Sequence, residues 1–144
     1  MGLDAFVFKS KQSLNWEELK DVPLTLDPRT GEYDVSYDYW DEYVFPLEYF
    51  EAISKRIGNM SAVGHMREHM TPLLDQENSI ILNKIVYNAI HDGEIPVSEL
   101  DQLEAELNHV EEHYDRENSL VRYFIECFRE LIAAARKENN PIVF

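Results

Sequence analysis

Four of the five histidines occur in two copies of one short pattern, H-x-x-E-H. The copies span His65–His69 and His109–His113, so the two histidines of each copy are four residues apart. In a helix this spacing puts both imidazoles on one face, as a metal ion requires when one helix supplies two ligands. The glutamate between them can act as a base toward a metal-bound water, as in the inverted zinc-peptidase motif. Glu106 also stands three residues before His109, which is the spacing of carboxylate-bridged sites in helical bundles.

The surroundings of the histidines favour ordinary surface residues over a metal centre. Leu100 and Leu107 take the first core position of a heptad, so His109 falls on the solvent side of its helix. On the helix of the first pair, a valine and two methionines form the core stripe and the histidines lie beside it. A di-iron bundle also needs two E-x-x-H units, and the sequence contains a single one. We therefore predict no cofactor, and keep as an alternative a metal-binding or metal-dependent hydrolase domain that uses His65, His69, His109 and His113.

Other catalytic patterns are missing from the sequence. No serine lies in a G-x-S-x-G elbow, and the 5 glycines form no loop that could cradle a phosphate. Cys127 is the only cysteine, so no disulfide can form within the chain, and its apolar neighbours predict a buried, inert thiol. The sequence therefore favours a non-catalytic protein and predicts no catalytic residue.

The charge of the chain is strongly negative and unevenly placed. There are 13 Lys and Arg against 28 Asp and Glu, a net charge of −15, which excludes the basic surface that nucleic acid or anionic lipid requires. Residues 32–54 contain seven acids and no Lys or Arg, and residues 92–117 contain ten acids against Arg116. We interpret the second stretch as the solvated side of an amphipathic helix.

The first acidic stretch is also dense in aromatic residues, with eight between residues 32 and 51. The rings between Tyr37 and Tyr43 are too closely spaced for all of them to point into a core, so some stay at the surface beside carboxylates. Surface Tyr and Trp are effective interface anchors, and neighbouring acids speed association with a basic partner. We predict a partner-binding patch of steering charges and aromatic anchors made by Asp34, Asp38, Tyr39, Trp40, Asp41 and Glu42. The alternative for this stretch is a core hairpin with a solubilising rim.

Short apolar runs and turn residues predict a small N-terminal sheet followed by helices. Residues 3–9 predict a strand, and Asp27–Gly31 predicts the turn of a hairpin whose return arm, Glu32–Tyr37, alternates rings with polar residues. Ile142–Phe144 can add a last strand. The predicted helices are Pro46–Gly58, Ser61–Met70, one from Asp75 or Ser79 to His91, one capped by Ser98 and ending near Tyr114, and Ser119–Lys137.

Two of these helices have distinctive apolar faces. The helix after Ser98 carries a narrow seam made by Leu100, Leu103, Leu107, Val110 and Tyr114. The helix from Ser119 has the widest apolar arc and is therefore expected to be the most buried. A chain of 144 residues fits a single domain, residues 1–144. We predict the α+β class, with a small N-terminal sheet of hairpin, edge strand and C-terminal strand packed against about five helices.

The opening residues Met1-Gly2-Leu3-Asp4-Ala5-Phe6-Val7-Phe8-Lys9 resemble the start of small bacterial and phage proteins of unassigned function. The resemblance implies a bacterial or phage origin and transfers no functional residue. The N-terminus lacks the pattern of a secretory signal, and no stretch reaches the roughly 18–20 apolar residues of a membrane span. With a single cysteine, these features lead us to expect a cytoplasmic protein that binds no membrane.

These observations favour a non-catalytic, acidic α+β domain that binds a basic protein partner, in the manner of an immunity protein, an antitoxin or a phage-encoded inhibitor. The metal-binding or hydrolase domain is one alternative. A structural homo-oligomer that associates through the leucine seam is the other.

Overall fold

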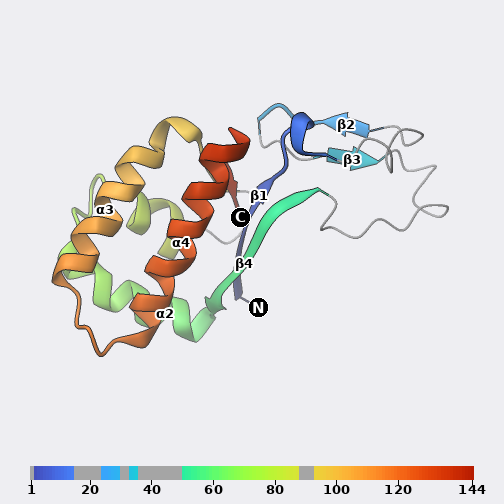
Figure 1. Ribbon diagram of the computed structural model, residues 1–144. Coiled ribbons are helices and arrows are strands. Elements are labelled where there is room, and N and C mark those ends of the chain that lie inside the picture. Colours follow the sequence, from blue (N-terminus) through green and yellow to red (C-terminus); the bar gives the residue numbers. More distant parts are fainter. Residues whose placement is uncertain (1, 15–23, 30–32, 36–49, 88–92) are drawn as a thin grey trace.

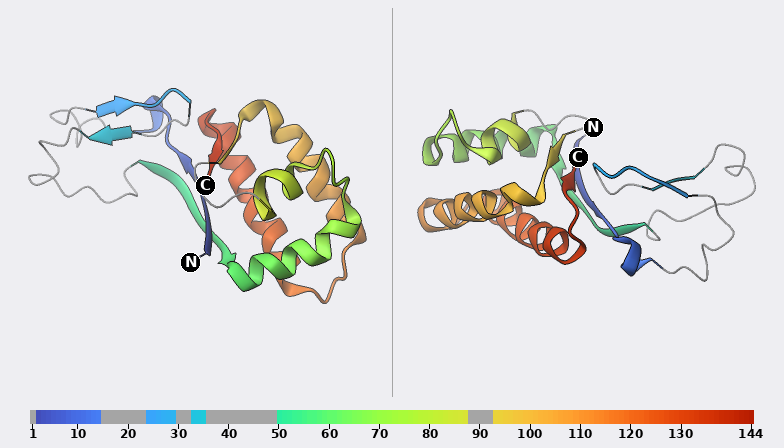
Figure 2. Two further views of the ribbon diagram at one scale, coloured as in Figure 1. Left: turned by 180° about the vertical axis from the view of Figure 1, so that it is seen from behind. Right: turned by 90° about the horizontal axis from the view of Figure 1, so that it is seen from above.

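A computed structural model describes residues 2–14, 24–29, 33–35, 50–87 and 93–144 of the chain (Figure 1). The described elements, in chain order, are β1 (Gly2–Phe8), η1 (Lys11–Ser13), β2 (Leu24–Leu26), β3 (Tyr33–Val35), β4 (Glu51–Asn59), α2 (Met60–Met70), η4 (Thr71–Leu73), η5 (Ile81–Val86), β5 (Glu94–Ile95), η6 (Val97–Glu99), α3 (Leu100–His113), α4 (Ser119–Glu138) and β6 (Ile142–Val143). The three α-helices gather on one side of the long β1–β4 pair, and β2 and β3 lie on the other side (Figure 2). The predicted α+β class is confirmed.

The main sheet has four antiparallel strands in the order β4-β1-β6-β5. β1 alternates between buried and half-buried residues, with Leu3, Ala5 and Val7 facing the helices. This is the period of two that a strand imposes when one of its faces is covered. The predicted strands at residues 3–9 and at the C-terminus are therefore both confirmed, and the C-terminal one lies beside β1 through the Phe6–Val143 pair.

The predicted helix Pro46–Gly58 is wrong over the part that the structure describes, because residues 51–59 form strand β4. Ile53 and Ile57 are four residues apart, a spacing that suits one face of a helix and equally suits alternate positions on one face of a strand. Pairing with β1 over nearly its whole length decides for the strand. Residues 46–49, at the start of the predicted helix, lie outside the described residues.

The predicted hairpin is confirmed by the antiparallel pairing of β2 with β3, although these strands form a separate two-stranded sheet. The turn begins as predicted at Asp27, whose Oδ1 accepts the backbone N–H of Arg29 at 2.9 Å. Arg29 in turn lies 3.1 Å from Glu94 of β5, which ties the turn to the main sheet.

The described residues contain three α-helices and one π-helix, so the expectation of about five helices is corrected to about four. α2 and α4 match their predicted ranges closely. The predicted cap at Ser98 is wrong, because Ser98 lies inside the 3-10 turn η6 and α3 begins at Leu100 without a side-chain cap. Among these described helices, none combines the length and apolar character needed to cross a bilayer.

The core lies between the helices and the inner face of the sheet. α4 packs against β4, β1, α2 and α3, and nine of its residues are buried, so the prediction that it is the most buried helix is confirmed. The leucine seam of α3 is also part of this core, because Leu100, Leu103, Leu107 and Val110 are at most 1% exposed. These four residues of the seam are therefore covered by other parts of the same chain. Homo-oligomerisation through the seam stays a prediction from the sequence.

Candidate functional site

The predicted partner-binding patch falls almost entirely outside the described residues. Only the backbone of Asp34 is described, in β3, where it is paired with Thr25. Asp38, Tyr39, Trp40, Asp41 and Glu42 lie outside the described ranges. These six residues remain a prediction from the sequence.

The first histidine pair lies on α2 and faces an open hollow of about 400 Å³. The ring centroids of His65 and His69 are 4.3 Å apart, so the rings lie side by side on one face of the helix as predicted. Across the hollow lie Asp115 and Glu117, from the connection between α3 and α4, and Leu120 of α4. Two imidazoles and two carboxylates from different parts of the chain therefore line the same hollow.

The second histidine pair, on α3, has the same internal geometry and different surroundings. The His109 and His113 rings are 4.4 Å apart, and both residues are exposed. Nδ1 of His113 lies 2.8 Å from the backbone carbonyl oxygen of His109, one turn earlier. The ring of His113 is thus held against its own helix.

The described residues contain no group of three or more His, Cys, Asp or Glu side chains placed to hold a metal ion. The E-x-x-H interpretation of Glu106 is specifically wrong, because its two carboxylate oxygens are occupied by donors of the protein. Oε1 accepts Ser79 Oγ at 2.5 Å and Ile81 N at 3.1 Å, and Oε2 accepts Ile80 N at 2.9 Å. The carboxylate acts as a cap for the segment that leads into η5.

The π-helix η5 is held at both ends by charged side chains from neighbouring helices. Glu106 of α3 binds the first backbone N–H groups, and Ser79 Oγ accepts the next one, from Leu82, at 3.1 Å. At the other end, Arg67 of α2 donates Nε–H to the carbonyl of Val86 at 2.9 Å and its guanidinium stacks on the ring of Tyr87. A negative group at the amino end and a positive group at the carboxyl end both suit the helix dipole.

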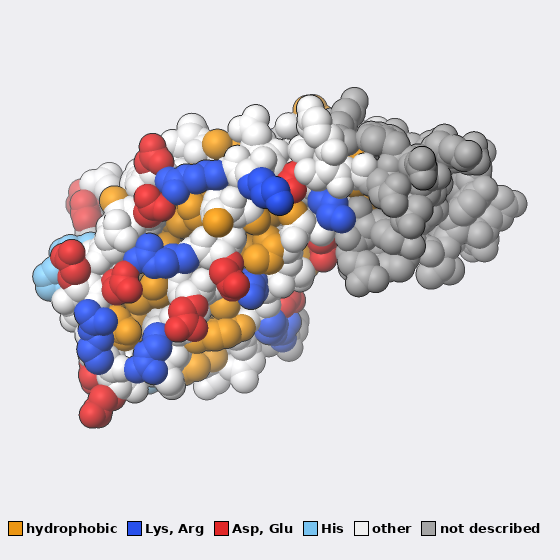
Figure 3. Space-filling view, viewed as in Figure 1, with side chains coloured by type: hydrophobic (Ala, Val, Ile, Leu, Met, Phe, Trp, Pro, Cys, Tyr) orange, Lys and Arg blue, Asp and Glu red, His pale blue; other side chains and the backbone are white. Residues whose placement is uncertain are grey.

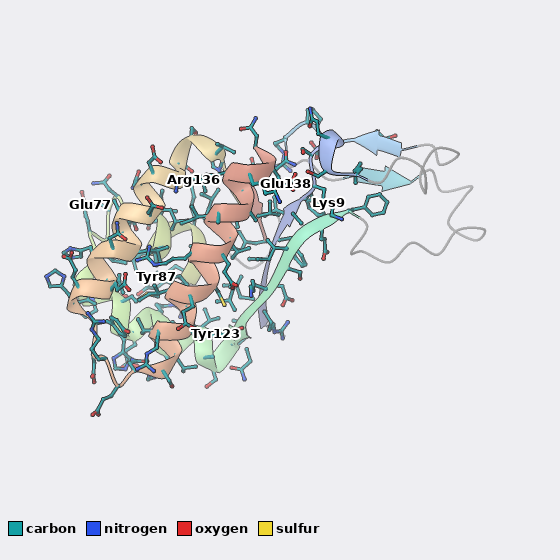
Figure 4. The ribbon with its side chains drawn as sticks, in the orientation of Figure 1. Lys9, Glu77, Tyr87, Tyr123, Arg136 and Glu138 are labelled. Carbon is teal, nitrogen blue, oxygen red and sulfur yellow. The ribbon has the colours of Figure 1, made fainter. Side chains whose placement is uncertain are left out.

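A second carboxylate, Glu138, is buried at the C-terminal end of α4 (Figure 4). Its Oε2 accepts the backbone N–H of Ser10 at 2.9 Å and the hydroxyls of Ser10 and Ser13 at 2.8 and 2.7 Å. Burial by itself raises the pKa of Glu138, but these hydrogen bonds together outweigh it and hold the pKa below its usual value. Glu138 therefore stays ionised and anchors the turn after β1 to α4.

Cys127 of α4 is buried as predicted. Burial raises the pKa of its thiol, which keeps the sulfur protonated and weakly nucleophilic at neutral pH. On the same face of α4, Tyr123 donates its hydroxyl to the carbonyl of Arg56 in β4 at 2.7 Å, and Glu130 pairs with Lys55 at 2.6 Å (Figure 4). These contacts fasten the helix to the sheet.

The second acidic stretch, residues 92–117, is more than a solvated face. Arg136 of α4 binds both Asp101 and Glu104 of α3 at 2.7 Å, and Arg129 binds Glu111. Basic and acidic side chains accordingly lie interspersed over this side of the molecule (Figure 3). Much of the charge in this stretch is used to join α3 to its neighbours.

Sequence reasoning missed the roles of Glu106 and Glu138, since both looked like ordinary acids on amphipathic helices. A weak signal existed for Glu138: it sits in the last turn of a helix, where the dipole disfavours an anion. An acid at that position needs donors from elsewhere in the fold. For Glu106 we find no signal in the sequence.

Comparison of the chain with protein-family models, with curated proteins and with solved structures found no match in any of the three.

Proposed function

We propose that this protein is a non-catalytic acidic domain that binds a basic protein partner in the bacterial cytoplasm, as an immunity protein, an antitoxin or a phage-encoded inhibitor does. The binding patch is the acidic, aromatic stretch that includes Asp34, Asp38, Tyr39, Trp40, Asp41 and Glu42. Clustered carboxylates raise the rate of encounter with a basic surface, and the rings supply anchoring area once contact is made.

The observation that carries the proposal is the charge pattern of the sequence, in which residues 32–54 contain seven acids and no Lys or Arg. Among the described residues, six Lys and Arg pair with acids of other segments: Arg29–Glu94, Lys55–Glu130, Arg56–Asp4, Lys84–Glu99, Arg129–Glu111 and Arg136 with Asp101 and Glu104. These basic residues are committed to holding the described elements together. The seven acids of residues 32–54, a stretch without Lys or Arg, supply a concentrated negative charge for a partner.

The test compares two triple variants with the same change in net charge. One neutralises the proposed patch (Asp38→Asn, Asp41→Asn, Glu42→Gln), and the other neutralises three exposed acids elsewhere (Glu77→Gln, Glu112→Gln, Glu126→Gln). Basic proteins captured from host extract by the full-length protein are purified, and their association rates are measured by stopped flow at low and high salt. We expect the patch variant to associate several-fold more slowly at low salt, while the control stays close to the unmodified protein.

A Tyr39→Ala, Trp40→Ala variant tests the anchors separately, because losing apolar contacts raises the dissociation rate and leaves the association rate nearly unchanged. Equal association rates for the two triple variants would show that the carboxylates of the patch do not steer association with the partner. Failure to capture any basic protein would reject the function itself.

A further inference from the structure

We propose that His65 and His69 form a binding site for a divalent transition-metal ion of the zinc or copper type, closed by a carboxylate from the connection between α3 and α4. This inference is independent of the proposed partner-binding patch. It concerns the hollow between α2 and the start of α4, and no part of it relies on residues 32–54.

The two imidazoles already have the proximity that a shared ion requires. Their centroids are 4.3 Å apart on adjacent turns of α2. Two nitrogens bound to one tetrahedral zinc stand roughly 3.3 Å from each other, given Zn–N distances of about 2.0–2.1 Å. Rotation of the two side chains is therefore enough to bring one nitrogen of each ring onto the ion, with no change in the backbone of the helix.

The opposite wall of the hollow supplies oxygen donors and negative charge. Asp115 and Glu117 line it, and Asp115 is held in place by accepting the backbone N–H of Glu117 at 3.0 Å. As they stand, no three His, Cys, Asp or Glu side chains of the described residues are close enough to surround an ion. We infer a site with two imidazoles fixed on α2, one carboxylate drawn in from the connection, and water in the remaining position.

The donor atoms of the site determine which metal ions it can bind. Neutral imidazole suits zinc, copper and nickel, whereas calcium and magnesium prefer an all-oxygen set. The net charge of −15 raises the local concentration of any cation near the surface. The second pair is the weaker candidate, because Nδ1 of His113 is directed at its own helix backbone.

Binding should also stabilise the fold, since the ion would join α2 to the connection between α3 and α4. A ligand that binds the folded state at a hundred times its dissociation constant raises the midpoint of thermal unfolding by roughly 5–10 °C for a domain of this size.

The experiment titrates ZnCl₂, and separately CuCl₂, into the full-length, untagged, chelator-stripped protein by calorimetry, with thermal unfolding as a second measurement. We expect one equivalent to bind at His65 and His69, and a His65→Ala, His69→Ala variant to lose at least tenfold in affinity together with the thermal shift. The matched His109→Ala, His113→Ala variant should keep both. Glu117→Gln should weaken binding several-fold, and the exposed control Glu112→Gln should not.

Circular dichroism of each variant without metal establishes that it is folded, so that a loss of binding reports on the site. Unchanged affinity in the His65→Ala, His69→Ala variant would overturn the proposal. Loss of the tight site in the His109→Ala, His113→Ala variant would overturn it as well.

Discussion

Glu106 and Glu138 are both acids that hold a neighbouring segment through hydrogen bonds, and they do so with different donors. Glu106 accepts backbone N–H groups at the start of η5, and the other end of η5 is held by the oppositely charged Arg67. Glu138 accepts mainly serine hydroxyls from the turn after β1, while lying at the end of α4 where the helix dipole opposes a negative charge.

The difference shows two ways in which a strongly acidic chain uses its acids for structure. At η5 the carboxylate replaces backbone hydrogen bonds that the first turn of any helix lacks, so the segment depends on it. At the turn after β1 the carboxylate supplements a segment that is also held by the strand pairing of β1. We therefore expect removal of the glutamate that holds η5 to lower the free energy of unfolding more than removal of the glutamate that holds the N-terminal turn.

The largest effect is expected for Glu106→Ala. This change leaves two backbone N–H groups and the buried Ser79 hydroxyl without their acceptor, and each unsatisfied buried donor costs about 1–3 kcal/mol. Because Glu106 is half-buried and water can replace part of these bonds, we expect a loss of about 2–3 kcal/mol in the free energy of unfolding, measured in urea. The control Glu112→Ala, at an exposed position of the same helix, should cost less than about 0.5 kcal/mol. Equal losses in the two variants would show that Glu106 does not hold η5.

Glu138→Gln should have the second largest effect, about 1–2 kcal/mol. The neutral amide can still accept one or two of the three hydrogen bonds, but it loses the charge that strengthens them. Hydrogen exchange should show faster exchange at the Ser10 amide and little change in α3. A loss larger than that of Glu106→Ala would reverse the ranking of the two regions.

The Glu138 interaction should also depend on pH. Its pKa is lowered in the folded state, so the folded protein binds the proton less readily than the unfolded chain does. The stabilisation is therefore present above the unfolded pKa of about 4.3 and is lost as the pH falls through the lower, folded pKa. Unfolding measured from pH 7 to pH 2 should show the difference between the unmodified protein and Glu138→Gln shrinking over this acidic range. A difference that is constant with pH would mean that the carboxylate charge is not responsible.

The smallest effect is expected for Arg67→Met, which keeps most of the aliphatic stem and removes the bond to the Val86 carbonyl and the stacking on Tyr87. We expect about 1 kcal/mol, because a single charge-assisted bond is lost and that bond is only partly buried. The Glu106→Ala, Arg67→Met double variant then measures whether the two ends of η5 act together. Strict additivity would mean that the ends are held independently.

Much of the fold could be predicted from local patterns. The short run of aromatic and branched residues at 3–9 identified β1, the turn at Asp27 identified the hairpin, and the apolar arc from Leu120 to Ile132 identified α4 as the central helix. Each of these signals comes from residues close together in the sequence, so it could be recognised without contacts from the rest of the fold.

The failures occurred where a pattern was ambiguous. The spacing of Ile53 and Ile57 fits a helix and a strand equally. Residues 51–59 form a strand because they pair with the edge of β1, which the local sequence does not indicate. The π-helical form of η5 could not be foreseen either, because it depends on donors and acceptors that Glu106 and Arg67 bring from other helices.

The sequence alone determined the charge of the chain, its elements with a single clear period, and the side-by-side placement of each histidine pair, because these properties depend on composition and on neighbours along one helix. Only the tertiary structure decided which acids became internal anchors and which groups lie across from His65 and His69. The carboxylates of Asp115 and Glu117 come from another part of the chain, and such contacts between distant parts are set by the packing of the whole molecule.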